Sequence, residues 1–117
     1  MYRIGVDLGG TNIAVGTSSS GYTCTVASYN ATWFGRTSFP SNPTITSALI
    51  EINSSACTSN SNFRKSTITH EIGHLLGLAD DPAVSSANMS LMHHDRNRTV
   101  IYEPQTFDVL NVIYIYS

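Results

Sequence analysis

The sequence predicts a single α+β domain in which a small mixed sheet backs one principal helix and a second helix follows near the end. Segments with strand-like alternation of polar and apolar residues occupy the first half of the chain. Apolar residues at helical spacing follow in 62–76, and a second helical segment starts near Pro104. With 117 residues, of which 41% are hydrophobic, the chain can bury one modest core.

Short strands are expected in the first half of the chain. Gly9-Gly10 predicts the turn of an N-terminal hairpin, and Ser18 to Gly21 is expected to be a flexible joint. Segment 44–52 shows the clearest alternation, although a short helix is an alternative there. The expected strands span 2–7, 12–16, 22–29, 33–39 and 44–52.

The principal helix is expected from about Asn62 to Leu76. Either Asn62 or Ser61 can cap it, because a short polar side chain accepts a hydrogen bond from the first helical turn. Gly77 is expected to end it, since glycine adopts the left-handed backbone conformation without steric cost. The apolar residues at helical spacing are Ile68, Ile72, Leu75 and Leu76.

The segment after the principal helix, residues 79–101, shows no periodicity and is expected to be irregular. A final helix is expected to start near Pro104, because proline suits a first helical position. Its apolar residues are expected to face the core. They are Phe107, Leu110, Val112 and Ile113.

Composition narrows the range of partners. The formal net charge is −2, and the six Lys and Arg residues are scattered, so no nucleic acid partner is expected. No apolar run approaches the ~20 residues that cross a bilayer, so no membrane partner is expected either. The N-terminus, MYRIGVDLGG, does not resemble a secretory signal. Cys24 and Cys57 leave two readings open, a disulfide in an exported protein or two buried thiols.

The segment 69–80, THEIGHLLGLAD, contains the strongest chemical signal in the chain. His70 and His74 are four residues apart, so on a helix both imidazoles project from one face and can bind the same zinc ion. Glu71 can take a proton from a water molecule that the metal activates. Gly77 lets the chain turn back, so that Asp80 can be a third ligand while a fourth position stays open.

The alternative reading of this segment is an amphipathic helix with two surface histidines. That reading explains the apolar residues of the helix. It does not explain why all four histidines of the chain fall within the helix and the segment after it. The joint match of several fixed positions therefore favours a metal centre, with one catalytic Zn²⁺ ion expected per chain.

The pattern HExxHxxGxxD in residues 70–80 resembles the zinc motif of the metzincin peptidases, in particular the small bacterial matrixin-like and snapalysin-like enzymes. The resemblance implies a truncated or minimal metzincin-like domain over residues 17–117, with an active-site helix, a Met-turn and a C-terminal helix. It implies an endopeptidase with Glu71 as general base. Met92 would be the Met-turn methionine, with Met89 as a weaker candidate. It also implies a secreted protein; we expect a monomer that acts on a peptide or protein substrate.

The resemblance extends to residues outside the motif. An edge strand over 33–39 would contact an extended substrate, through Trp33, Phe34, Gly35 and Arg36. Two residues after the Met-turn methionine, where several metzincins have tyrosine, this chain has His94. We hypothesise that His94 contacts the metal or donates to a tetrahedral oxyanion; an exposed loop histidine is the alternative. The long helix that usually precedes the edge strand in the family has no counterpart here.

A second resemblance concerns residues 4–16, IGVDLGGTNIAVG, which are similar to the phosphate-binding hairpin of ROK-type sugar kinases. A fragment of an ATP-dependent sugar kinase is therefore a remote alternative. Phosphoryl transfer needs elements from both lobes of such an enzyme, and 117 residues do not provide them. Residues 1–16 are expected to form an N-terminal β-hairpin, either as part of the sheet or as a fused, foreign segment.

The main alternative to a peptidase is a catalytically inactive zinc-binding domain, a remnant that keeps the metal for structure. Both hypotheses share the ligands His70, His74 and Asp80. Glu71 discriminates between them, because a structural zinc site does not require a general base and fills its fourth position with protein. The sequence therefore favours zinc-dependent hydrolysis of peptide bonds.

Overall fold

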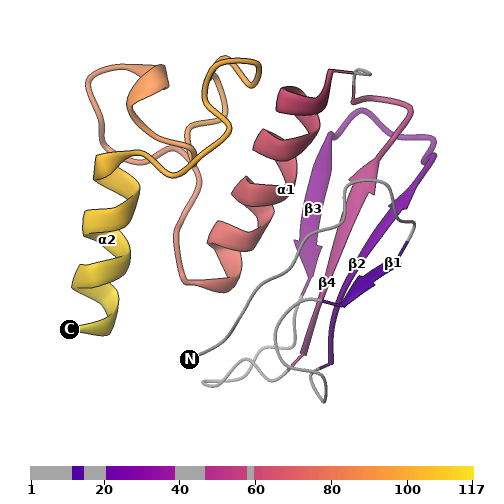
Figure 1. The fold of residues 1–117 in the computed structure, drawn as a ribbon, viewed down its shortest axis with the longest axis horizontal. Helices are drawn as coiled ribbons and strands as arrows, with labels where there is room; N and C mark the ends of the chain where they lie inside the picture. The colour runs from indigo at the N-terminus through magenta and orange to yellow at the C-terminus, as the bar shows by residue number, and fades with distance from the viewer. Residues whose placement is uncertain (1–11, 15–20, 39–46, 58–59) are drawn as a thin grey trace. The chain divides into compact units, whose positions relative to one another are not determined.

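The structure is a computed structural model that describes residues 12–14, 21–38, 47–57 and 60–117 (Figure 1). The chain divides into two compact units between Cys57 and Thr58. The first contains the described strands and the second contains the helices, which confirms the predicted α+β class. The predicted strand 2–7, most of the kinase-like segment and the expected boundary at residue 16 lie outside the described residues.

The first unit is a mixed sheet, as predicted. Its strands are β1 (Asn12–Ala14), β2 (Gly21–Ala27), β3 (Gly35–Ser38) and β4 (Ser47–Asn53), in the order β1-β2-β4-β3. β2 and β4 are parallel, whereas β1 pairs with β2 and β3 pairs with β4 in antiparallel fashion. Within the described part of the sheet, β3 is therefore an edge strand (Figure 1). The short-helix alternative for 44–52 is wrong for residues 47–52.

Alternation along β4 explains which face of the sheet is buried. Ala48, Ile50 and Ile52 are buried, whereas Leu49 between them is exposed, because successive side chains of a strand point to opposite faces. Cys24 of β2 pairs with Ile50 and is buried as well. Burial raises the pKa of the Cys24 thiol to about 11. Cys24 and Cys57 are both buried and are not joined in a disulfide, in line with the second reading of the cysteines.

Asn53, fully buried at the end of β4, holds the loop that precedes β3. Its side-chain oxygen accepts a hydrogen bond from the N–H of Tyr29 at 3.0 Å. Its amide nitrogen donates to the carbonyls of Ala31 and Trp33, both at 3.1 Å. Because both the oxygen and the nitrogen of this buried amide have hydrogen-bond partners in the loop, Asn53 fixes the course of the loop.

The second unit begins with α1 (Ser61–Leu75). The cap of α1 is Asn60, whose Oδ1 accepts from the N–H of Phe63 at 3.1 Å, so the prediction of Asn62 or Ser61 as the cap is wrong. The helix begins one residue earlier than predicted, and the amide of Asn62 donates instead to the carbonyl of Thr99 at 3.3 Å. Ile68 and Ile72 are buried as predicted, while Leu75 and Leu76 are half-buried.

The second helix of this unit is α2 (Thr106–Tyr116), preceded by the 3₁₀ turn η1 (Ala87–Met89) in an otherwise irregular segment (Figure 1). Pro104 lies outside the helix, because Gln105 and Asp108 form a reciprocal capping box that sets its start.

The apolar face of α2 is less buried than predicted. Phe107 and Val112 are half-buried, but Leu110 and Ile113 are 58% and 57% exposed, so their assignment to the core is wrong. The buried residue of α2 is Asp108, because its carboxylate has hydrogen-bond partners inside the unit.

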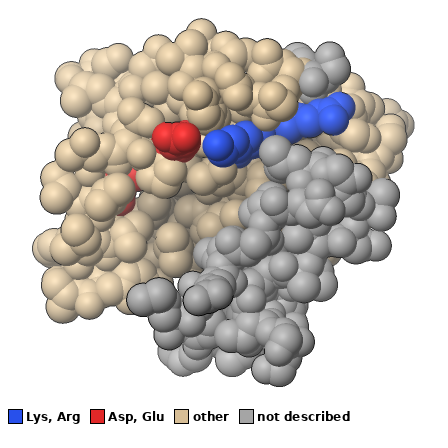
Figure 2. Space-filling view, in the orientation of Figure 1, with Lys and Arg blue, Asp and Glu red and all other residues tan. Residues whose placement is uncertain are grey.

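Charged side chains are sparse on the described part of the face shown in Figure 2, as the low charged fraction of the chain leads one to expect. Among the described residues, no helix is long and apolar enough to cross a membrane.

Candidate metal centre

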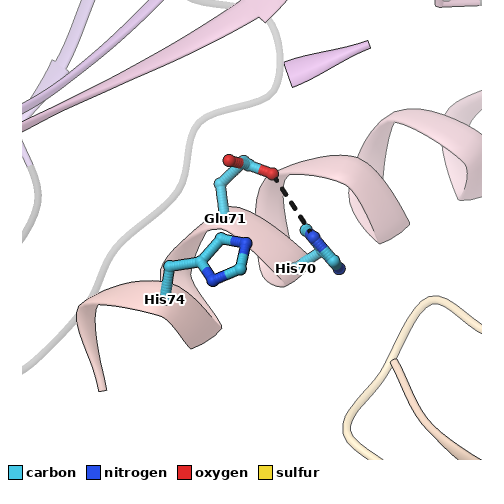
Figure 3. A group of neighbouring side chains, drawn as sticks. All are labelled: His70, Glu71 and His74. Carbon is cyan, nitrogen blue, oxygen red and sulfur yellow. Dashed lines mark ion pairs between the residues drawn. The ribbon is translucent and has the colours of Figure 1, made fainter. Parts of the chain in front are cut away.

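The two histidines of the motif lie one turn apart on α1. Figure 3 shows His70, Glu71 and His74 along the C-terminal half of the helix. The imidazole centroids of His70 and His74 are 4.8 Å apart, with the ring planes perpendicular. The three residues offer ligand atoms within 4.8 Å of one another. The predicted helical spacing therefore brings these side chains together.

Backbone carbonyls fix the protonation pattern of both imidazoles. The Nδ1 of His70 lies 3.0 Å from the carbonyl oxygen of Leu91, and the Nδ1 of His74 lies 2.9 Å from that of Leu78. A carbonyl oxygen can only accept, so each Nδ1 must carry the proton. In the neutral ring the Nε2 then has a free lone pair, which is the state that a metal ligand requires.

The turn after α1 returns Asp80 to the two histidines. Gly77 has φ +93°, as predicted for the residue that ends the helix. The N–H of Leu78 donates to the carbonyl of Gly73 and the N–H of Gly77 to that of His74, which is the Schellman arrangement. Two residues beyond Leu78, one carboxylate oxygen of Asp80 lies 2.9 Å from Nε2 of His70 and 3.2 Å from Nε2 of His74.

These distances fit a zinc ion. Nitrogen and oxygen ligands about 2.0–2.2 Å from a tetrahedral zinc lie about 3.3 Å from one another. The separations of 2.9 and 3.2 Å between the Asp80 oxygen and the two nitrogens are close to that value. His70, His74 and Asp80 can therefore act as three ligands, and they have the donor types that zinc prefers.

Glu71 lies beside these ligands. Glu71 is only 4% exposed, and its Oε2 lies 3.6 Å from Nε2 of His70, as the dashed line in Figure 3 marks. The side chain of Asp80 is 58% exposed, so the centre is open to solvent on the side of that residue. A buried carboxylate beside a solvent-accessible metal centre is suitably placed to accept a proton from water.

Burial sets the charge state of His70. The pKa of His70 is lowered to about 4, chiefly by burial and also by the positive charge of Arg96 and by His74, against the opposing effects of the Leu91 carbonyl and Asp80. His70 is therefore neutral at neutral pH. Its close approach to Asp80 then brings two lone pairs together, because Nε2 is unprotonated and a carboxylate oxygen is an acceptor.

Met92 packs against α1 at Gly73. It is 1% exposed, and a Cβ atom added to Gly73 would lie 2.5 Å from its Sδ. The N–H of Met92 donates to Oγ of Ser90 at 3.0 Å, which closes a tight turn. Met89, the weaker Met-turn candidate, is 47% exposed. The predicted role of Met92 as the Met-turn methionine stays a prediction.

Asp108 supports this turn, and sequence reasoning did not identify it. Its carboxylate, which is buried, accepts from Oγ of Ser90 at 2.6 Å and from the N–H groups of Leu91 and Gln105 at 2.8 Å each. Leu91 is also the residue whose carbonyl orients His70. Asp108 thus acts indirectly on the orientation of His70, a predicted metal ligand. The signal in the sequence was its position three residues after Gln105, typical of a capping box.

Arg96 was not identified from the sequence either. Its side chain connects the segment that follows Met92 with α1. Its Nε donates to Oγ of Ser66 at 2.9 Å, its Nη2 to the Ser66 carbonyl at 3.2 Å and its Nη1 to the His93 carbonyl at 3.0 Å. Burial lowers the pKa of Arg96 to about 9, with a smaller contribution from Arg98. The carboxylates of Glu71, Asp80 and Asp108 oppose this shift. No sequence signal marks such a buried arginine.

The remaining predicted site residues lie elsewhere. The ring of His94 contacts Oδ1 of Asp81 through Nδ1, and its Nε2 lies 3.2 Å from Oδ1 of Asp95. In the first unit, the guanidinium of Arg36 lies 4.4 Å from the ring centroid of Trp33 and bonds to Glu51 at 2.8 Å. The roles predicted for His94 in catalysis and for residues 33–36 in substrate binding stay predictions.

Comparison of the chain with known protein families, with curated proteins and with solved structures finds no match.

Proposed function

We propose that the protein is a zinc-dependent endopeptidase in which His70, His74 and Asp80 hold the metal. One observation carries the proposal. A single carboxylate oxygen of Asp80 lies within 3.2 Å of two imidazole nitrogens, and in the neutral rings both nitrogens carry lone pairs, because each Nδ1 holds the proton that bonds to a carbonyl. Three acceptors that converge in this way repel one another unless a positive charge lies among them.

A proton on His70 is the competing source of that charge. Burial opposes it, since the pKa of His70 is lowered to about 4 and the ring is neutral at neutral pH. A divalent cation meets the same need and binds the neutral form. For His70, the arrangement therefore supports a metal ion rather than a hydrogen-bonded pair with Asp80.

The roles of the side chains follow from their chemistry. When bound, zinc supplies a Lewis acid that lowers the pKa of a water molecule and polarises the scissile carbonyl. Glu71 accepts the proton from that water and passes it to the leaving nitrogen. Asp80 neutralises one positive charge of the centre, and the carbonyls of Leu91 and Leu78 keep His70 and His74 in the ligating tautomer.

The first test is a zinc count by elemental analysis on the wild type and on Asp80→Ala. The proposal expects about one zinc in the centre of the wild type and loss of that ion, or at least about tenfold weaker binding, in the variant. A folded wild type that binds no zinc would contradict the proposal.

The second test separates a peptidase from a zinc-binding remnant. Glu71→Gln keeps the size of the side chain but removes the base, so we expect it to retain zinc and to lose hydrolysis of a broad peptide library by at least about 10²-fold. Glu103→Gln, an exposed carboxylate on the same unit, is the matched control and should cleave normally. A wild-type protein that holds zinc but cleaves no peptide would favour the alternative hypothesis of a catalytically inactive zinc-binding domain.

A further inference from the structure

A second group of metal-binding side chains lies in the same unit. Asp81, His93 and His94 offer ligand atoms within 4.8 Å of one another. The Nδ1 of His94 contacts Oδ1 of Asp81. The imidazoles of His93 and His94 are stacked, with centroids 5.3 Å apart and planes 13° from parallel. None of these residues belongs to the proposed catalytic centre.

The donor set of this group points to a transition metal. Two imidazoles and one carboxylate suit divalent Zn²⁺, Cu²⁺ or Ni²⁺ better than Ca²⁺ or Mg²⁺, which prefer oxygen ligands. The side chains of Asp81 and His94 are 53% and 59% exposed, so an ion can enter from solvent and water can complete its coordination. His93 is half-buried, which limits the mobility of one ligand.

The backbone already brings the group together. The N–H of Asp81 donates to the carbonyl of Met92 at 3.2 Å, and the N–H of His94 donates to Oδ1 of Asp81 at 3.2 Å. Asp81 has φ 51°, a left-handed conformation that non-glycine residues adopt at a cost. An ion held by Asp81 and His94 would therefore tie the loop that carries Asp80 to the residues after the Met-turn.

We propose that Asp81, His93 and His94 form a second metal site, for an imidazole-preferring divalent ion such as Zn²⁺, which fixes the loop that presents Asp80. The competing explanation is an ion pair of His94 with Asp81 and Asp95, supported by the 3.2 Å contact between His94 Nε2 and Asp95 Oδ1. An ion pair requires no participation of His93 and takes up no metal. Metal binding thus separates the two explanations.

The experiment uses the full chain, stripped with a chelator and dialysed against Zn²⁺ alone, with zinc counted by elemental analysis. The proposal expects two zinc ions in the wild type and one in His94→Ala and in Asp81→Asn, or at least about tenfold weaker binding at one site. Asparagine at position 81 tolerates the left-handed backbone, so the variant should fold. Glu103→Gln removes an equal charge elsewhere and should keep two ions. Circular dichroism checks that each variant is folded.

The double variant His70→Ala/His74→Ala separates this site from the catalytic centre. If it keeps one zinc that a further His94→Ala removes, the second site stands whatever becomes of the peptidase proposal. One zinc in the wild type that is retained in His94→Ala would overturn the second site and leave the catalytic centre intact. The second site would also be overturned if the wild type bound two zinc ions and neither Asp81→Asn nor His94→Ala lowered that count. A folded wild type without zinc would overturn it as well.

Discussion

Single residues determine how the proposed metal ligands are held. His70 and His74 are each fixed by one carbonyl at Nδ1, and Asp80 faces both of their Nε2 atoms. The carbonyl that orients His70 belongs to Leu91, whose own N–H bonds to Asp108. Because orientation of a ligand affects metal affinity as well as position, a change at Asp108 should be measurable at the metal.

Asp108→Asn tests this connection. The carboxylate accepts three hydrogen bonds, and an amide replaces one accepting oxygen with a donor that faces other donors. We expect a loss of about 1–3 kcal/mol in unfolding free energy and roughly 10–100-fold weaker zinc binding. Urea unfolding and zinc titration measure the two effects. Glu103→Gln is the exposed control, and unchanged zinc affinity in a folded Asp108→Asn protein would exclude the orienting role.

Gly73→Ala tests the packing of Met92. A Cβ at position 73 would lie 2.5 Å from Sδ of Met92, which is buried, so the Met92 side chain would have to shift. Overpacking of this kind costs about 1–3 kcal/mol, whereas Gly→Ala in an unobstructed helix gains about 0.5–1 kcal/mol. The sign of the change in unfolding free energy, measured by urea unfolding, therefore shows whether Met92 packs closely against the helix. A stabilised Gly73→Ala protein would show that Met92 does not pack closely on the helix.

At the level of elements, the ends of the helices decide where the site residues lie. α1 ends in a Schellman arrangement at Gly77, and this turn places Asp80 within reach of the histidines of its last turns. α2 starts at a capping box that contains Asp108. In both cases, the residues that satisfy the free backbone groups of a helix end also position side chains of the proposed metal centre.

Gly77→Ala tests the turn after α1. With φ at +93°, an alanine at this position adopts a backbone conformation that costs about 1–2 kcal/mol. An added Cβ would make ordinary contact with Ile115 at 3.6 Å, so the expected loss of stability comes from strain and not from a clash. Gly77→Asn should lose less, because asparagine tolerates the left-handed conformation. Equal stability of the alanine and asparagine variants in urea would contradict this account.

At the level of the whole molecule, the described residues divide into a sheet unit and a helical unit, and the proposed centre lies entirely within the helical unit. Its ligands come from α1 and from the turn after it, while the residues that support them come from the later segment and from α2. Because His70 of this centre is buried, its protonation should affect the folding equilibrium.

The stability of the metal-free protein should fall as the pH falls from about 6.5 to about 4. Over this range an unfolded chain protonates His70, whose ordinary pKa is 6.5, whereas burial holds its pKa near 4 in the folded protein. The unfolded state then binds more protons and is favoured, by up to about 3 kcal/mol. Urea unfolding of chelated protein at several pH values measures the slope. The variant His70→Gln should show a flatter dependence of unfolding free energy on pH. An equally steep dependence in that variant would contradict its assignment to His70.

The motif in residues 70–80 is local, and for this reason the sequence predicted which side chains of the candidate site come together. Helical spacing alone predicts that His70 and His74 share a face, and a glycine at position 77 predicts the turn that returns Asp80. The alternation in 44–52 likewise predicted β4, because one face of that strand is buried. The supporting contacts of Asp108 and Arg96 were not predicted, because they join residues 17 to 30 positions apart.

The sequence by itself determined the α+β class, the two main helices and the side chains that converge at the centre, since each follows from local spacing. Tertiary structure alone decided which tautomer His70 and His74 adopt, that Asp108 anchors the turn at Ser90, and that Leu110 and Ile113 are exposed. The physical reason is that hydrogen-bond partners and burial depend on which distant segments meet, and no periodicity in the chain encodes that pairing.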